Sequence, residues 1–236
     1  MAEQIKKATR DSFGEAVCAL AKDNENIVVL DADLAAATKT GMFKKAFPDR
    51  FVDCGIAECN MVGIAAGLAT CGKIPFAASF AMFSAGRAFE QVRNSVAYPK
   101  LNVKIVGSHA GISVGEDGAT HQCCEDFATM RTLPGMVVLC PCDGNEMRAA
   151  TKALLSYEGP AYMRLGRLAV DTVTDTLPDY KFEIGKGVTV KDGSDVTIVA
   201  TGMMVQMAVK SAEALNAQGI SARVLDFHTI KPLDEA

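Results

Sequence analysis

The sequence of 236 residues contains no tryptophan, few aromatic residues and no excess of basic residues. Its net charge of -4 at pH 7 provides no general attraction to polyanions, so we expect it to bind neither nucleic acid nor an acidic membrane surface. No apolar run approaches the roughly 20 residues of a membrane-spanning helix, and the first residues lack the apolar core of a signal peptide. We therefore expect a cytoplasmic protein.

The sequence has eight cysteines, but none of them forms a CxxC pair. A disulfide framework is typical of small secreted chains, and this chain is neither small nor expected to be secreted. The clusters at 123–124 and 140–142 could in principle bind a metal, yet a free cysteine more often packs as a small hydrophobic residue. We therefore expect free thiols and no metal held by this chain.

Short apolar runs alternate with longer segments of helical periodicity, which is typical of a parallel sheet covered by helices on both faces. Asp143 is expected to cap the helix that follows one of these runs. The fold class is therefore predicted as α/β, with a doubly wound parallel sheet over residues 1–168. The expected strands are 27–33, 50–55, 74–79, 102–108, 136–141 and 161–166.

The sequence changes character after this region. Residues 169–193 have scattered apolar positions among Asp, Thr, Pro and Gly, and they are predicted to form a linker. A βαβ pattern follows in 194–236, where His228 is interpreted as structural. One βαβ unit cannot cover both faces of its own sheet, so we expect only the start of a second α/β domain here.

Glu58 lies in the segment GIAECNMVGIAAGLA (55–69), directly after an expected strand. Open α/β sheets bind ligands at the carboxyl ends of their strands, so this carboxylate could serve a ligand. It could also simply complement the positive end of the helix dipole. Spacing alone favours this second interpretation.

Two other segments hold candidate site residues. SHAGISVGEDGATHQ (108–122) is rich in glycine and holds two of the three histidines, so it could be a metal site, a phosphate-binding loop, an acid/base loop or an ordinary polar loop. Phe80 and Phe83 lie in FAASFAMF (76–83), and an aromatic pair at this spacing is more often part of the core than of a ligand site.

Together these segments resemble the transketolase family. The first differs from the family signature GIAEQNMVGIAAGLA only in Cys59 for Gln, and the second is similar to a family loop that reads roughly THDSIGVGEDGPTHQ. The resemblance implies a pyrimidine-binding domain for thiamine diphosphate, with Glu58 hydrogen-bonded to N1′ of the aminopyrimidine ring. A carboxyl group there stabilises a proton on N1′, which favours the imino form of the 4′-amino group.

The resemblance also implies roles for four further side chains. His121 is expected to move protons near the 4′-amino group and the substrate oxygen, and His109 is counted with it as catalytic. His109 and Asp117 are expected to hydrogen-bond the hydroxyl groups of the sugar. Arg164 in AYMRLGR matches an arginine that clamps the sugar phosphate, although an arginine that only extends from a strand end is almost as plausible.

Four more positions match residues that hold the cofactor. Phe80 and Phe83 resemble the first two aromatics that stack on the aminopyrimidine, whereas Gly86 stands where a tyrosine often adds a third contact. Asp33 and Leu34 resemble a family element that lies near the thiazolium and helps to hold the cofactor bent.

Nothing in the sequence matches the GDG-then-asparagine element with which the family binds magnesium and the diphosphate. The resemblance therefore implies a two-chain transketolase, in which a separate amino-terminal subunit holds the diphosphate and Mg²⁺ or Ca²⁺. It further implies a dimer of heterodimers that transfers a two-carbon ketol unit between sugar phosphates. This chain alone is expected to be inactive.

Three other functions remain open. The chain could belong to a split synthase for deoxyxylulose phosphate, but such synthases lack the first histidine, which is His109 here. It could be the β subunit of a ketoacid dehydrogenase, although the paired histidines argue against this. It could also be a non-catalytic dimer scaffold, which would not need Glu58, His109 and His121 together.

Overall fold

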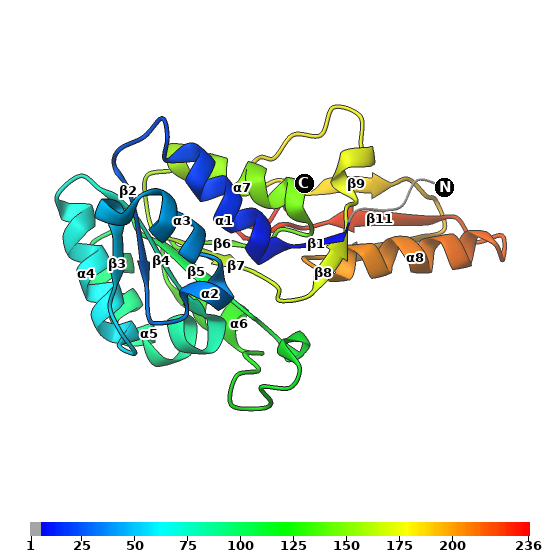
Figure 1. The fold of residues 1–236 in the computed structure, drawn as a ribbon. Coiled ribbons are helices and arrows are strands. Elements are labelled where there is room, and N and C mark those ends of the chain that lie inside the picture. The colour runs from blue at the N-terminus through cyan, green and yellow to red at the C-terminus, as the bar shows by residue number, and fades with distance from the viewer. Residues whose placement is uncertain (1–5) are drawn as a thin grey trace.

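The computed structural model describes residues 6–236 and shows two α/β units, a larger one and a smaller one (Figure 1). Residues 1–5, which open the predicted domain 1–168, lie outside the described residues. Within 6–236, no helix has the length and apolar character needed to cross a membrane. The helices are α1 (Thr9–Leu20), α2 (Ala35–Thr38), α3 (Gly41–Ala46), α4 (Glu58–Thr70), α5 (Phe89–Gln91), α6 (Asp126–Thr132), α7 (Gly144–Ser156) and α8 (Met204–Asn216).

The larger unit is built on a seven-stranded sheet with the order β12-β6-β7-β5-β4-β2-β3. All neighbouring strands run parallel except β12, which pairs antiparallel with β6. The predicted α/β class with a mostly parallel sheet is therefore confirmed. The strands of this sheet are β2 (Ile27–Asp31), β3 (Phe51–Asp53), β4 (Ile74–Phe80), β5 (Lys104–Ser108), β6 (Val137–Leu139), β7 (Ala161–Arg164) and β12 (Thr229–Lys231).

Helices cover both faces of this sheet (Figure 1). Side chains alternate along each strand, so Val29 belongs to the core cluster shared with α1, α3 and α7, while Leu30 belongs to the cluster shared with α4 and α6. The second face also carries two π-helical segments, η2 (Met82–Arg87) and η3 (Val92–Ala97). Because both faces are buried, the strands read as continuous apolar runs in the sequence.

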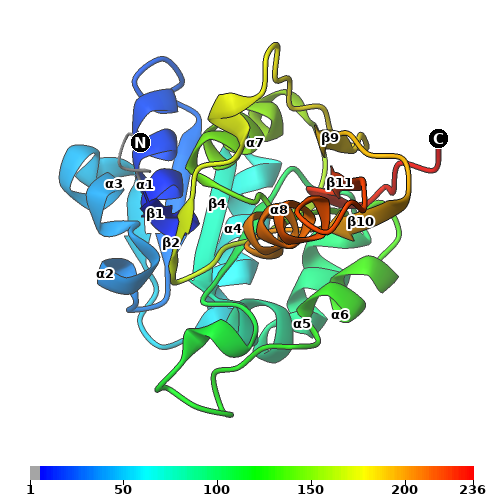
Figure 2. The same ribbon diagram turned by 90° about the vertical axis from the view of Figure 1, so that its right-hand side faces the viewer.

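The smaller unit has a three-stranded sheet, β10-β11-β9, on which α8 packs through alanine and valine side chains. In Figure 2 this smaller unit lies in front of the large sheet. Its strands are β9 (Val188–Lys191), β10 (Val196–Ala200) and β11 (Ala222–Asp226). The predicted linker 169–193 thus contains β9, and also β8 (Ala169–Asp171), which pairs with β1 (Lys6–Ala8). Strands this short are fixed by distant partners, which local composition does not reveal.

The order of the strands determines where a ligand can bind. The chain passes from β2 to β3 on one side and then crosses to β4 on the other, so the strand order reverses at the β2–β4 pair. A crevice forms at the carboxyl ends of the strands on either side of such a reversal. The loops that follow β2, β4, β5 and β7 all leave the sheet at this edge.

Candidate active site

Glu58 is the first residue of α4 and reaches the carboxyl edge of the sheet from the loop after β3. Its side chain is only 2% exposed, and Oε2 accepts a hydrogen bond from Nη1 of Arg87 at 3.0 Å. Within residues 6–236, Oε1 accepts no hydrogen bond. Glu58 therefore complements the helix dipole and also keeps one carboxylate oxygen for a ligand.

An aromatic cluster lies at the end of β4. The rings of Phe80 and Phe83 are stacked, with centroids 5.9 Å apart and planes at 9°. The imidazole of His109 stacks on Phe80 at 3.9 Å, and His121 meets the edges of both phenylalanines. Phe80 is buried, whereas Phe83 is partly exposed, so Phe83 supplies most of the accessible aromatic surface.

His109 follows β5 and adopts a left-handed backbone conformation with φ 58°. Its Nε2 lies 3.0 Å from Nη1 of Arg10, which can only donate, so Nε2 must accept. The proton is therefore assigned to Nδ1, which donates to Oγ of Ser108 at 2.8 Å. Burial, and secondarily the charge of Arg10, lowers the pKa of His109 to about 4, so this imidazole is neutral at neutral pH.

Arg10 was not predicted as a site residue. Its Nη1 also donates to the carbonyl of Ala37 at 3.0 Å, and its Nε is buried without a partner. The signal that could have identified it is topological. A helix that precedes a parallel strand begins at the carboxyl edge of the sheet, and Arg10 lies in the first turn of α1, which precedes β2.

The two remaining residues of the histidine-containing loop differ in their placement. His121 is half-buried, and its Nδ1 lies 2.9 Å from Oγ1 of Thr120. Asp117 is exposed, and within residues 6–236 no hydrogen bond ties it to the other site residues. The structure thus brings His121 to the aromatic cluster but leaves Asp117 on the surface of the loop.

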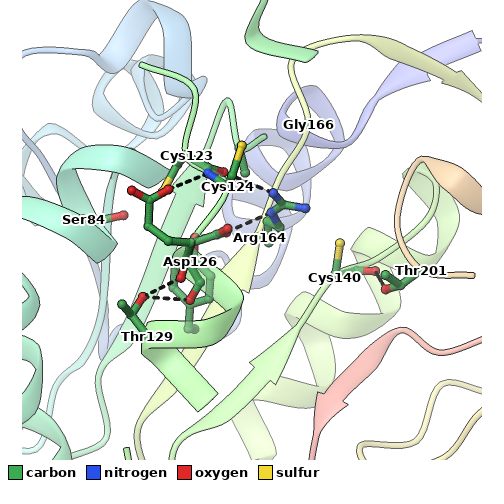
Figure 3. A network of polar contacts seen from close by, with 12 residues as sticks. Ser84, Cys123, Cys124, Asp126, Thr129, Cys140, Arg164, Gly166 and Thr201 are labelled. Atoms are coloured by element: carbon green, nitrogen blue, oxygen red, sulfur yellow. Dashed lines mark hydrogen bonds and ion pairs between the residues drawn. The ribbon is translucent and has the colours of Figure 1, made fainter. Parts of the chain in front are cut away.

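The side chain of Arg164, at the end of β7, is held by hydrogen bonds to neighbouring residues of this chain (Figure 3). Its Nε donates to Oδ2 of the fully buried Asp126 at 2.8 Å, and its Nη2 donates to the carbonyl of Cys123 at 3.4 Å. The guanidinium also lies over the ring of Phe127, 4.3 Å from its centroid. The side chain remains 21% exposed, so part of the guanidinium can still meet a ligand.

The loop after β2 carries Asp33 and Leu34. It is fixed by the buried Asp31, whose Oδ1 accepts from the amide of Leu34 at 2.6 Å and whose Oδ2 accepts from the hydroxyls of Thr38 and Thr40 at 2.7 Å each. Burial raises the pKa of Asp31. Asp33 itself is exposed, with a left-handed φ of 61°. Asp31, which holds Leu34 in place, was not among the predicted site residues, and the amide of Asp33 donates to Asp53 instead.

Taken together, the edge presents a buried carboxylate with one oxygen available, an accessible aromatic surface and a half-buried histidine. This set of groups fits a flat heteroaromatic ring that has a nitrogen able to share a proton. Arg10 and Arg164 supply cations for an anionic group at the same edge.

Comparisons with known proteins agree with this geometry. Profiles of the transketolase pyrimidine binding domain and of the transketolase C-terminal domain match residues 5–172 and 185–236. A Methanocaldococcus jannaschii protein, named provisionally as a transketolase C-terminal section, is 52% identical over 98% of this chain and 73% of its own length. A 6-deoxy-6-sulfo-D-fructose transketolase subunit of Clostridium sp. is 46% identical, over 96% of this chain and 70% of its own.

A solved structure described as a split gene transketolase, inactive β4 tetramer, superimposes with a TM-score of 0.87 at 54% identity. The match covers 96% of this chain and 73% of the solved one. The fold and the sequence relationship therefore indicate the same family.

Proposed function

This chain belongs to the transketolase family, and we propose that it is the pyrimidine-binding subunit of a two-chain transketolase. The family uses thiamine diphosphate. The observation that carries the proposal is the pairing of the buried Glu58, which keeps Oε1 available, with the partly exposed ring of Phe83 at the same sheet edge. An aminopyrimidine needs both an acid at N1′ and an aromatic surface against its face.

Bound thiamine diphosphate supplies an electron sink for the transfer of a two-carbon unit. The residues of this chain would do the rest. Glu58 would hold a proton at N1′ through Oε1, and Phe83 would orient the ring. His121, next to this surface, would exchange protons with the substrate oxygen. His109 would help only indirectly in the arrangement described, since Arg10 and Ser108 occupy both of its ring nitrogens.

The cofactor's diphosphate and its Mg²⁺ or Ca²⁺ are assigned to a separate amino-terminal subunit, because the sequence lacks the element that binds them. The solved relative described as an inactive β4 tetramer supports the view that such a chain is inactive without its partner. We propose a dimer of heterodimers, in which each active site contains groups from both kinds of chain.

The substrates are proposed to be ketose and aldose phosphates. Arg10 and Arg164 provide positive charge at the site edge, and guanidinium groups suit phosphate well. One relative is named for a sugar with a sulfonate in place of phosphate, so the anionic end of the sugar differs within the family.

Reconstitution tests this proposal. The chain should be assayed alone and together with an amino-terminal transketolase subunit, with thiamine diphosphate, Mg²⁺, xylulose 5-phosphate and ribose 5-phosphate. We expect no ketol transfer by this chain alone and robust transfer by the pair. Turnover by this chain alone would overturn the two-chain assignment. A stable pair that binds no cofactor would instead indicate a dimer scaffold.

A further inference from the structure

Arg87, the last residue of η2, contacts both elements of the proposed pyrimidine site. Its Nη1 donates to Oε2 of Glu58 at 3.0 Å. The same guanidinium lies over the ring of Phe83, with Cζ 4.7 Å from the centroid. One side chain thus links the buried acid to the exposed part of the aromatic cluster.

The segments around Glu58 and Phe83 depart from the family pattern at two positions, and both adjoin Arg87. The thiol of Cys59 lies 3.5 Å from the carbonyl of Arg87, to which it donates. Gly86 immediately precedes Arg87, and a Cβ added at Gly86 would lie 2.7 Å from Cε of Met82. Both departures therefore adjoin the backbone of Arg87, and Gly86 stands where the family pattern often has a tyrosine.

The pairing has a physical consequence for the carboxylate. A buried carboxylate without a partner is costly, and a charge-assisted hydrogen bond to one oxygen removes that cost and fixes the orientation of the group. Arg87 uses Oε2 only, so Oε1 remains for a ligand. A guanidinium can donate in its plane and stack on a ring with its face, which a lysine cannot do equally well.

We propose that Arg87 is a positioning residue, which holds the carboxylate of Glu58 so that Oε1 faces the aminopyrimidine and which completes the aromatic side of the site by stacking on Phe83. This inference rests on the proposed function. It assigns Arg87 no contact with the reacting atoms, so its effect should pass through Glu58.

The test compares Arg87→Met with the wild type in the assembled two-chain protein. We expect the dissociation constant for thiamine diphosphate, measured by calorimetry, to rise about tenfold. This lies at the lower end for a lost hydrogen bond to a charged group, because the guanidinium is half-exposed. Proton exchange at the thiazolium C2 should slow, while the KM for the sugar should change less than about threefold, since Arg87 does not reach the sugar in this scheme.

Two further variants separate positioning from a structural role. Arg87→Lys should recover part of the cofactor affinity, because it keeps the charge. In a Glu58→Gln background, Arg87→Met should add little, since coupled residues are not additive. Arg148→Met is the matched control, because Arg148 is exposed on α7, which packs on the opposite face of the sheet.

The outcomes are distinguishable. Wild-type affinity and C2 exchange in an active Arg87→Met pair would refute the role of Arg87 and leave the proposed function intact. Full additivity of Arg87→Met with Glu58→Gln would also refute it. If the wild-type pair itself bound no thiamine diphosphate, both the proposed function and this inference would fail together.

Discussion

Two regions of the molecule differ in how fully their polar side chains are hydrogen-bonded. One is the sheet edge that carries Glu58, and the other is the contact between the two units. At the edge, polar groups keep hydrogen-bonding capacity: within residues 6–236, Oε1 of Glu58 accepts no hydrogen bond, and the guanidinium of Arg87 donates with one of its five N–H groups. The contact between the units holds a second set of polar residues, which we call the junction cluster: Cys142, Asp143, Glu146, Tyr180 and Asp226. Four of the five are fully or nearly fully buried.

Asp143 and Glu146 of the junction cluster accept all their hydrogen bonds from within the protein. Asp143 caps α7 by accepting from the amides of Asn145 and Glu146, and it also accepts from the amides of Val173 and Thr174 at 2.8 Å each. Glu146 accepts from the amide of Cys142 at 2.7 Å and from the hydroxyl of Tyr180 at 2.6 Å. These bonds tie α7 of the large unit to the segment that leads into the small one.

The comparison separates two uses of a buried carboxylate. Where every acceptor has an internal donor, as at Asp143, the group serves the fold and its removal should cost stability. Where one oxygen accepts no hydrogen bond from residues 6–236, as at Glu58, the group is available to a ligand and its replacement should cost activity instead. Mutations at both places can confirm or break this distinction.

Glu58→Gln should produce the largest effect. The amide can still hydrogen-bond, but it cannot share a proton with N1′, so turnover of the reconstituted pair should fall about 100-fold or more, on the scale of general acid/base catalysis. The unfolding midpoint of the chain should change little. Steady-state kinetics and thermal unfolding measure the two. A variant whose C2 proton exchanges at the wild-type rate would show that Glu58 has another role.

Asp143→Ala should reduce the stability of the chain rather than its activity. It removes a helix cap and leaves the buried amides of Val173 and Thr174 without acceptors, which together should cost about 2–4 kcal/mol of unfolding free energy. Urea unfolding measures this loss. Asp175→Ala, at an exposed site in the same segment, is the control and should stay within about 0.5 kcal/mol of the wild type. Equal stability of the two variants would contradict the structural role of the junction cluster.

Arg164→Ala should affect both properties, because Arg164 serves the fold and also lies at the edge. Loss of a charge-assisted contact should raise the KM for phosphorylated sugars by about 10- to 100-fold, or about 1.5–3 kcal/mol. Turnover at saturation should change little, since a remote phosphate contact is present in both ground and transition states. Removal of the guanidinium also leaves the buried Asp126 with Tyr162 as its remaining donor, so some stability should be lost.

Unphosphorylated sugars provide the comparison for this variant. If Arg164 binds the phosphate, their KM should be nearly unaffected. An equal change for both kinds of sugar would mean that Arg164 acts only through Asp126 and belongs with the junction cluster as a structural residue.

Much of this fold could be predicted because its main strands are buried on both faces. Runs such as IVVLD in β2 are continuous and apolar, and they end at polar residues that mark the sheet edge. The cap at Asp143 was likewise predictable, since a short acceptor before a helix is a local signal. Resemblance to family motifs, rather than spacing, is what singled out Glu58 and Phe83.

The remaining features depend on contacts between distant segments. The strand β12 returns from the small unit to pair with β6, and three residues carry too little pattern to predict that. Arg10 meets His109 across 99 positions, and Arg87 meets Glu58 across 29. Arg164 was expected to face the substrate, but the sequence does not reveal that it also pairs with the fully buried Asp126.

The smallest predicted effect concerns Asp226 at the end of β11. Within residues 6–236, neither of its carboxylate oxygens accepts a hydrogen bond. A carboxylate oxygen of Asp226, one of Glu146 and the sulfur of Cys142 lie within 4.8 Å of one another. Burial, followed by the negative charge of Glu146, raises the pKa of Asp226 well above its usual value. Because Glu146 accepts two hydrogen bonds that favour its ionised form, we expect Asp226 to be the acid that carries the proton.

This assignment predicts a pH dependence with a definite sign. An aspartate in the unfolded chain ionises near pH 4. Above that pH the folded chain holds one more proton than the unfolded chain, so the unfolding free energy falls as the pH rises toward the pKa of the folded state.

Asp226→Asn has no proton to lose at this position and should lack this contribution. The advantage of the variant over the wild type should therefore grow as the pH rises above about 4, by at most about 1.4 kcal/mol per pH unit for one proton. Urea unfolding at several pH values measures the difference, in which contributions from His109 and the other unchanged groups cancel. A difference that stayed constant with pH would show that Asp226 is ionised in the fold and would overturn the assignment of the proton to Asp226.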